Sequence, residues 1–125
     1  ADHSHCHLLH GYSLAFTFKF GCTELDEKNW AVDFGGLKPL KKWLEDNFDH
    51  KTAIDKNDPH LDKFMELQSH DLCEVVVMDG VGAEKFAEHA FNYADALVRG
   101  MSGGRCYCVS AECAEHGSNS AIYEA

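Results

Sequence analysis

Three groups of side chains in this 125-residue chain have the types and spacing that metal or acid–base chemistry requires. The first lies near the N-terminus, where Cys6 stands among the imidazoles of His3, His5, His7 and His10. Imidazoles at this density suit a divalent transition metal, zinc above all. A thiolate among them can instead act as a base or a nucleophile. The remaining interpretation is a histidine-rich terminus that binds nothing specific.

The second group is the pair Asp49 and His50, which follows a predicted helix. Adjacent side chains diverge in a regular helix or strand, but they can meet in a turn. A carboxylate beside an imidazole fixes its tautomer and raises its basicity, as a general base requires. The alternative is a histidine that only interacts with the last carbonyl groups of the helix.

The third candidate is Glu115, which the alternation of a predicted strand over residues 105–116 places on one face with Val109 and Cys113. A carboxylate buried at the end of a strand requires a partner. A ligand edge with two parallel N–H donors, like that of guanidine, would satisfy it bidentately. If the end of the strand is exposed, Glu115 is an ordinary solvated residue.

The pattern of apolar residues predicts the elements that must position these groups. Period-two alternation and short apolar runs predict strands over 13–20, 30–34, 74–79, 105–116 and 120–123. Helical spacing of apolar residues predicts helices over 37–48, 61–68 and 83–99. This order predicts one α+β domain over residues 1–125, with an antiparallel sheet and helices packed on one face.

Composition excludes several classes of protein. The chain carries 21 acidic and 11 basic residues, a net charge of −10, which argues against nucleic acid as a partner and against a basic membrane-surface helix. Its longest apolar stretches are a handful of residues, too short to span a bilayer. The six cysteines include no Cys-x-x-Cys pair, so we expect reduced thiols in a cytoplasmic protein.

Taken together, the three groups fit a known pattern, and their motifs occur in order over nearly the whole chain. The motifs are Cys6-x-x-x-His10-Gly11, the VDFGGLK run at 32–38, Phe48-Asp49-His50, Gly82-Ala83-Glu84 and Glu115-x-x-x-Asn119-Ser120-Ala121-x-Tyr123. On these motifs the chain resembles the 6-pyruvoyl-tetrahydropterin synthase and 6-carboxy-tetrahydropterin synthase group, whose members have the tunnelling fold.

The resemblance implies a zinc-dependent lyase that eliminates triphosphate from dihydroneopterin triphosphate to give a 6-pyruvoyl- or 6-carboxy-tetrahydropterin. It implies that Cys6 is the base, that Asp49 and His50 relay protons, and that Glu115 anchors the aminopyrimidine edge of the pterin. It also places Gly82 and Ala83 in the turn that contacts the pterin. The gap between Cys6 and His10 resembles the bacterial carboxy-forming branch, which leads toward deazapurine nucleosides such as queuosine.

Three departures from the family pattern bear on the metal site and the pterin-contacting turn. Tyr12 stands where the family has a third histidine after His10-Gly11, and a tyrosine ligates zinc only as phenolate. The family's first zinc ligand lies on a strand preceding the cysteine motif, which this chain is expected to lack, so His5 is the candidate substitute. Gly82 also replaces a usual threonine. The alternative function is therefore a zinc-depleted homologue that binds a pterin or purine, and a third is a histidine-rich metal-binding or assembly protein.

The resemblance also implies an assembly. Family members form trimers whose sheets join into a barrel, two trimers stack into a hexamer, and the active sites lie between subunits. We therefore expect a homo-oligomer, which would cover the sheet edges of a small domain.

Overall fold

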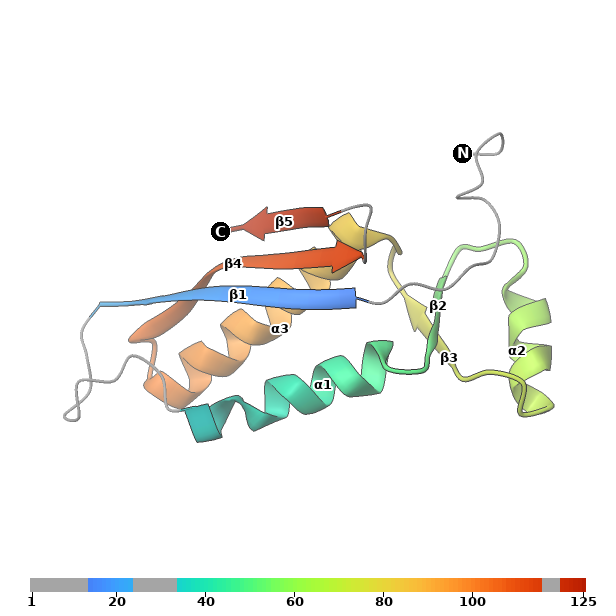
Figure 1. Ribbon diagram of the computed structural model, residues 1–125, viewed down its shortest axis with the longest axis horizontal. Coiled ribbons are helices and arrows are strands. Elements are labelled where there is room, and N and C mark those ends of the chain that lie inside the picture. Colours follow the sequence, from blue (N-terminus) through green and yellow to red (C-terminus); the bar gives the residue numbers. More distant parts are fainter. Residues whose placement is uncertain (1–13, 24–33, 116–119) are drawn as a thin grey trace.

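The computed structural model describes residues 14–23, 34–115 and 120–125. A three-stranded antiparallel sheet has the order β1-β4-β5, and a second sheet pairs β2 with β3 in parallel (Figure 1). The elements are, in chain order, β1 (Leu14–Cys22), the 3-10 turn η2 (Phe34–Leu37), α1 (Lys38–Phe48), β2 (Thr52–Asp55), α2 (Leu61–Ser69), β3 (Val75–Met78), α3 (Ala83–Ser102), β4 (Cys106–Glu115) and β5 (Ser120–Glu124).

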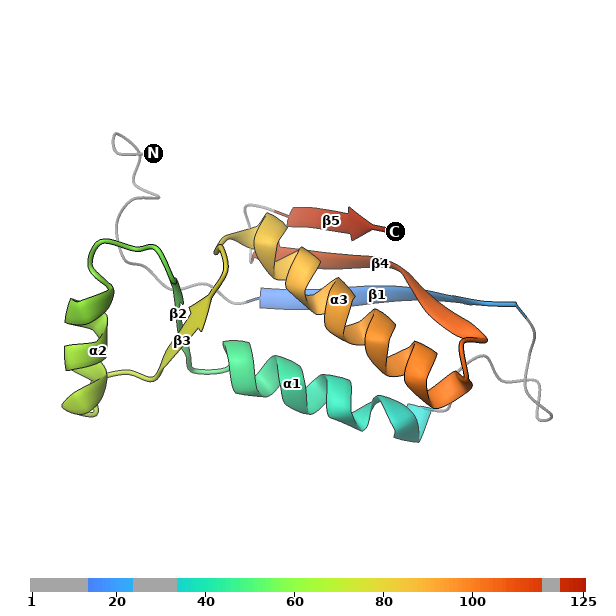
Figure 2. The same cartoon turned by 180° about the vertical axis from the view of Figure 1, so that it is seen from behind.

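The predicted α+β class is confirmed, and two helices cover one face of the antiparallel sheet. The long helix α3 packs along β4 and β5, with α1 beside it on the same face (Figure 2). The core between these layers is made by Leu40 of α1, by Phe91 and Ala94 of α3, and by Cys108 and Ala111 of β4. The third helix, α2, lies away from this sheet, against the small β2–β3 pair.

The short strand β2 was absent from the sequence prediction. Its four residues include one buried side chain, Ile54, which is too little pattern to reveal a strand. The strand predicted over 30–34 falls outside the described residues except for Phe34, which begins η2 rather than a strand. No helix in the described part of the chain is both long and apolar enough to cross a membrane.

A β-bulge in β4 corrects the predicted face of that strand. Lys19 of β1 pairs with Ser110, but the next residue, Phe20, pairs with Cys108, so Val109 is an extra residue. The bulge shifts the alternation along the strand. Before the bulge Cys106 and Cys108 face the core, and after it Ala111 and Cys113 face the core. The prediction that Val109 shares the face of Cys113 was therefore wrong.

Along the first half of β4, side chains of α3 accept backbone hydrogen bonds that a neighbouring strand would otherwise accept. Strand β5 pairs with β4 only from Ser110 onward. Before that point, the backbone N–H of Cys106 donates to Ser102 Oγ at 2.8 Å, and that of Cys108 donates to Asp95 Oδ1 at 2.9 Å. These bonds satisfy backbone donors that a sheet ladder would otherwise take, and they fix β4 against α3.

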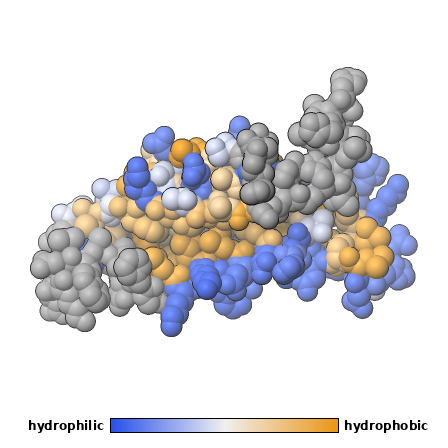
Figure 3. Space-filling view, in the orientation of Figure 1, coloured by the Kyte–Doolittle hydropathy of each residue, from blue (hydrophilic) through white to orange (hydrophobic). Residues whose placement is uncertain are grey.

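The surface combines an apolar band with a charged helix. In Figure 3 the hydrophobic colouring follows the sheet, while hydrophilic side chains line the outer surface of α1. Phe16, Phe18 and Phe20 of β1 are half-buried and alternate with exposed residues. Among the described residues, β1 and β5 are the two edge strands of the antiparallel sheet.

Candidate active site

Three phenylalanine rings join the strand and the two helices at one end of the antiparallel sheet. The ring centroid of Phe48, the last residue of α1, lies 4.9 Å from that of Phe16 on β1. It also lies 5.0 Å from the ring centroid of Phe86 in the first turn of α3, in an edge-to-face arrangement. Aromatic pairs at these separations favour such tilted geometries. The cluster therefore holds the end of α1 against the starts of β1 and α3.

Each ring lies close in sequence to a predicted site motif. The pair Asp49–His50 directly follows Phe48, and the Gly82–Ala83 turn precedes Phe86 within one helical turn. Phe16 pairs with Cys113, and Leu14 at the start of β1 pairs with Glu115. Both ribbon views place the end of α1, the starts of α3 and β1 and the end of β4 together (Figures 1 and 2).

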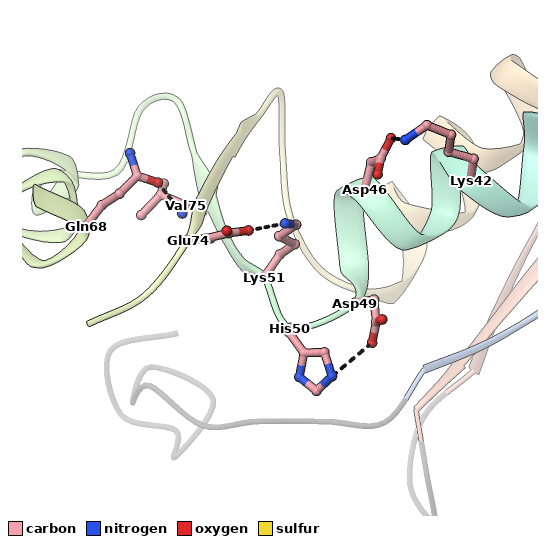
Figure 4. A network of polar contacts seen from close by, with 8 residues as sticks. All are labelled: Lys42, Asp46, Asp49, His50, Lys51, Gln68, Glu74 and Val75. Carbon is pink, nitrogen blue, oxygen red and sulfur yellow. Dashed lines mark hydrogen bonds and ion pairs between the residues drawn. The ribbon is translucent and has the colours of Figure 1, made fainter. Parts of the chain in front are cut away.

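Asp49 and His50 face one another, as their turn position predicts. The Nε2 atom of His50 lies 3.5 Å from Oδ1 of Asp49 (Figure 4). The Asp49 N–H donates to the carbonyl of Glu45 at 3.1 Å, which ends α1, and His50 then adopts a left-handed backbone with φ 56°. Residues other than glycine rarely adopt this conformation, and it concentrates at functional sites. The His50 side chain is 94% exposed, so a substrate can reach its imidazole.

Glu115 is half-buried at the end of β4, and its charge acts on a neighbouring thiol. Burial, together with the nearby carboxylates of Glu115 and Glu112, raises the pKa of Cys113 to about 11. Cys113 therefore stays protonated near neutral pH and cannot serve as a base there. Glu115 itself lies where a strand ends, beside the start of β1, and can accept hydrogen bonds from a ligand at this end of the sheet.

The turn before α3 has a backbone conformation at position 82 that suits glycine. Gly82 has φ 108° and ψ 164°, a conformation that is open essentially only to glycine. A Cβ atom built there would meet no atom within 4 Å, so backbone strain rather than a clash disfavours a side chain. The Gly82 carbonyl accepts the N–H of Phe86 at 2.8 Å, which begins α3, and the His89 imidazole contacts the carbonyl of Gly80 at 3.4 Å.

The remaining predicted site residues lie outside the part of the chain that the structure describes. They are the predicted base Cys6 and the predicted zinc ligands His10, Tyr12 and His5. Within residues 14–23, 34–115 and 120–125, no three histidine, cysteine, aspartate or glutamate side chains are grouped so as to hold a metal ion.

Comparison with known protein families shows which family the chain belongs to. The model of the family described as 6-pyruvoyl tetrahydropterin synthase matches residues 1–125, the whole chain. The chain belongs to the 6-pyruvoyl tetrahydropterin synthase family. The resemblance found in the five sequence motifs is thereby confirmed.

Curated relatives of this tetrahydropterin synthase family carry the name 6-carboxy-5,6,7,8-tetrahydropterin synthase. The protein from Rickettsia bellii is 30% identical over 89 residues, which are 70% of this chain and 63% of that protein. The one from Rickettsia conorii is 31% identical over 62 residues, 49% of this chain and 45% of its own length. The matches thus span about half to two-thirds of these relatives.

A solved structure shares the fold. An uncharacterized protein from Wolinella succinogenes superimposes with a TM-score of 0.79 at 19% identity, covering 95% of this chain and 80% of its own. At this identity the likeness shows that the two chains share a fold.

The residues that position the site were not recognised from the sequence as a group. Phe48 adjoins the Asp49–His50 motif, and Phe86 follows the Gly82–Ala83 turn. That adjacency was the available signal. Their mutual contact depends on tertiary packing, which no spacing in the sequence specifies.

Proposed function

We propose that this chain is a pterin-forming lyase that acts on dihydroneopterin triphosphate and eliminates triphosphate to give a 6-carboxy- or 6-pyruvoyl-tetrahydropterin. One observation carries the proposal: in a chain of this family, the Asp49–His50, Gly82–Ala83 and Glu115 motifs gather at one end of the sheet. The names of the curated relatives favour the 6-carboxy product.

His50 is proposed to move protons of the substrate side chain together with Cys6. The Asp49 carboxylate, 3.5 Å away, is placed to orient the imidazole, as a general acid–base requires. The exposure of His50 leaves its ring open to a ligand. The role of Cys6 as base rests on the family motif Cys6-x-x-x-His10-Gly11.

Glu115 is proposed to bind the aminopyrimidine edge of the pterin. That edge offers two parallel N–H donors, which a carboxylate accepts bidentately. The Gly82–Ala83 turn is proposed to lie against the ring, because the absence of a side chain at Gly82 leaves open space beside the backbone. Together these groups would fix the heterocycle and leave its side chain toward His50.

Zinc is the proposed metal, and its ligands would be His10 with His5 and Tyr12. Imidazole nitrogen is a preferred zinc ligand, whereas the phenol of Tyr12 binds only after losing its proton. A bound zinc ion would polarise the hydroxyl groups of the substrate side chain. The tyrosine favours a second candidate function, a zinc-depleted family member that binds a pterin or purine without the full reaction.

The chain is proposed to act as a homo-oligomer, a trimer or hexamer, with sites shared between subunits. Strands β1 and β5 are edge strands among the described residues, and an apolar band follows the sheet (Figure 3). Pairing between such edges would protect them. A cytoplasmic location, expected from the cysteine pattern, stays a prediction.

Incubation of the whole chain with dihydroneopterin triphosphate, with and without added zinc, tests the proposal by mass analysis of the product. A 6-carboxy-tetrahydropterin that forms with zinc supports the lyase. Binding of the substrate without any product, in the presence of zinc, would instead establish the binding homologue. If neither a product nor binding of the substrate is observed, both proposed functions are excluded.

A further inference from the structure

Two cysteines lie directly opposite one another at the end of the sheet farthest from the candidate site. Cys22, the last residue of β1, pairs in register with Cys106, the first residue of β4. Figure 1 shows this end of β1 and β4 opposite to the end where α1 finishes and α3 begins. The pair therefore shares no residue with the proposed active site.

The register of this pair is fixed by contacts on both sides. The Thr23 N–H donates to the Arg105 carbonyl at 3.0 Å. On the other side, a Cβ atom added to Gly21 would lie 2.8 Å from the ring of Tyr107, so the tyrosine covers the glycine closely. A slip of one residue would break the hydrogen bond and drive this ring against a side chain.

The hydrogen bonds also identify the type of pair. Because Thr23 bonds to Arg105, the next pair along the strands, Cys22 and Cys106, is of the non-hydrogen-bonded type. The N–H of Cys106 indeed points away from β1, to Ser102 Oγ. The Cα atoms of such pairs lie about 4.5 Å apart with their side chains close. Disulfides span Cα separations of about 4.4–6.8 Å, so the backbone already permits a bond.

The two other cysteines of β4 lack this arrangement. Cys108 lies opposite Phe20 and Cys113 opposite Phe16. Both are fully buried, as Cys106 is, and burial together with nearby carboxylates raises the pKa of each to about 11, which suppresses the reactive thiolate. Cys22 is half-buried, so it is the member of its pair that a reagent in solution can reach.

We propose that Cys22 and Cys106 are a modification site, a dithiol that a low-molecular-weight disulfide such as glutathione disulfide oxidises to a cross-strand disulfide. The Cys22 thiolate attacks one sulfur of the reagent, forming a mixed disulfide and releasing one small thiol. Cys106 then loses its proton, attacks the Cys22 sulfur and releases the second small thiol. The two cysteines lose two electrons, and the small disulfide is reduced to two thiols.

The bond would enclose α1, α2 and α3 in one covalent loop. A cross-link over so long a loop restricts the unfolded chain, so the oxidised protein should unfold at a higher urea concentration than the reduced protein. The proposal is independent of the pterin reaction, because its readout is a covalent bond and not turnover.

The test incubates the native chain with glutathione disulfide, blocks remaining thiols and digests the protein with trypsin. Cys22 then lies in the peptide 20–28, and Cys106 lies in the peptide 106–125 together with Cys108 and Cys113. Cys6 and Cys73 lie in two other peptides, 1–19 and 64–85. We expect a linked species of 20–28 and 106–125, cleaved by reductant, in wild type and in the matched variant Cys108→Ala.

Loss of the linked species in Cys106→Ala, with its retention in Cys108→Ala, would support the pair. If Cys106→Ala does not fold, fragmentation of the linked wild-type peptides identifies which cysteine of 106–125 is bonded to Cys22. Three results would each overturn the proposal. The link could form only in urea, it could persist in Cys106→Ala, or the reaction could stop at a glutathione adduct of Cys22.

Discussion

The ring of Phe48 lies 4.9 Å from the ring of Phe16, and this contact joins the last residue of α1 to the edge strand β1. The same ring meets Phe86 of α3 at 5.0 Å. Since Asp49 and His50 follow Phe48 directly, the position of the imidazole depends on how this ring packs. The site is thus held by an apolar cluster beneath it rather than by polar contacts alone.

Removal of the Phe48 ring should lower turnover by more than it lowers the stability of the fold. Deleting a buried phenylalanine costs about 3–5 kcal/mol, and half-buried Phe48 should lie below that range, so Phe48→Ala should cost roughly 2 kcal/mol of unfolding free energy. Turnover of dihydroneopterin triphosphate should fall further than this loss of folded protein explains. Urea unfolding and kinetics measure the two effects. The control is Phe64→Ala in α2, also half-buried, which should leave kcat unchanged.

Replacement of His50 by glycine should separate chemistry from stability. His50 has φ 56°, a conformation that glycine adopts without strain, so His50→Gly should change the unfolding free energy by less than about 1 kcal/mol. It should nevertheless abolish turnover if the imidazole transfers protons. Asp71 has φ 60° and is exposed, which makes Asp71→Gly the matched control that keeps turnover. Equal rates in the two variants would remove His50 from the mechanism.

The elements that the sequence predicted correctly are those with long, regular patterns. Alternation along β1 and helical spacing along α3 each persist over enough residues for burial to follow them. The bulge at Val109 was not predictable in this way, because residues 106–109 are apolar at every position and show no alternation. Only the pairing with Lys19 and Phe20 reveals the extra residue.

In the candidate site, too, a local feature was predictable from the sequence pattern and a long-range one was not. Asp49 and His50 were paired correctly because a turn after a helix lets neighbours meet, a local property of the chain. Their placement at the same end of the sheet as Gly82 and Glu115 depends on contacts among Phe16, Phe48 and Phe86, which are far apart in sequence. The family motifs implied that convergence, whereas spacing alone could not.

Neutralising Glu115 should weaken pterin binding without unfolding the protein. A hydrogen bond to a charged group contributes about 1.5–3 kcal/mol, so Glu115→Gln should raise the Kd for a pterin by about 10- to 100-fold. Equilibrium titration of pterin fluorescence measures the change. Glu112→Gln is the matched control, because Glu112 is a half-buried carboxylate on the same strand that pairs with Thr17. A Kd that rises equally in both variants would show a general effect of charge and not a contact.

The two buried thiols of β4 should make the fold sensitive to alkali. Burial raises the pKa of Cys108 and of Cys113 from the ordinary value of 9.0 to about 11. Below pH 9 both thiols are protonated in the folded and unfolded states, so their contribution to stability is fully present. Between pH 9 and about 11 the unfolded chain releases these protons first, so the unfolding free energy should fall as pH rises. Urea unfolding across this range measures the slope, and Cys113→Ala should reduce it. An unchanged slope in Cys113→Ala would show that other groups cause the alkaline loss.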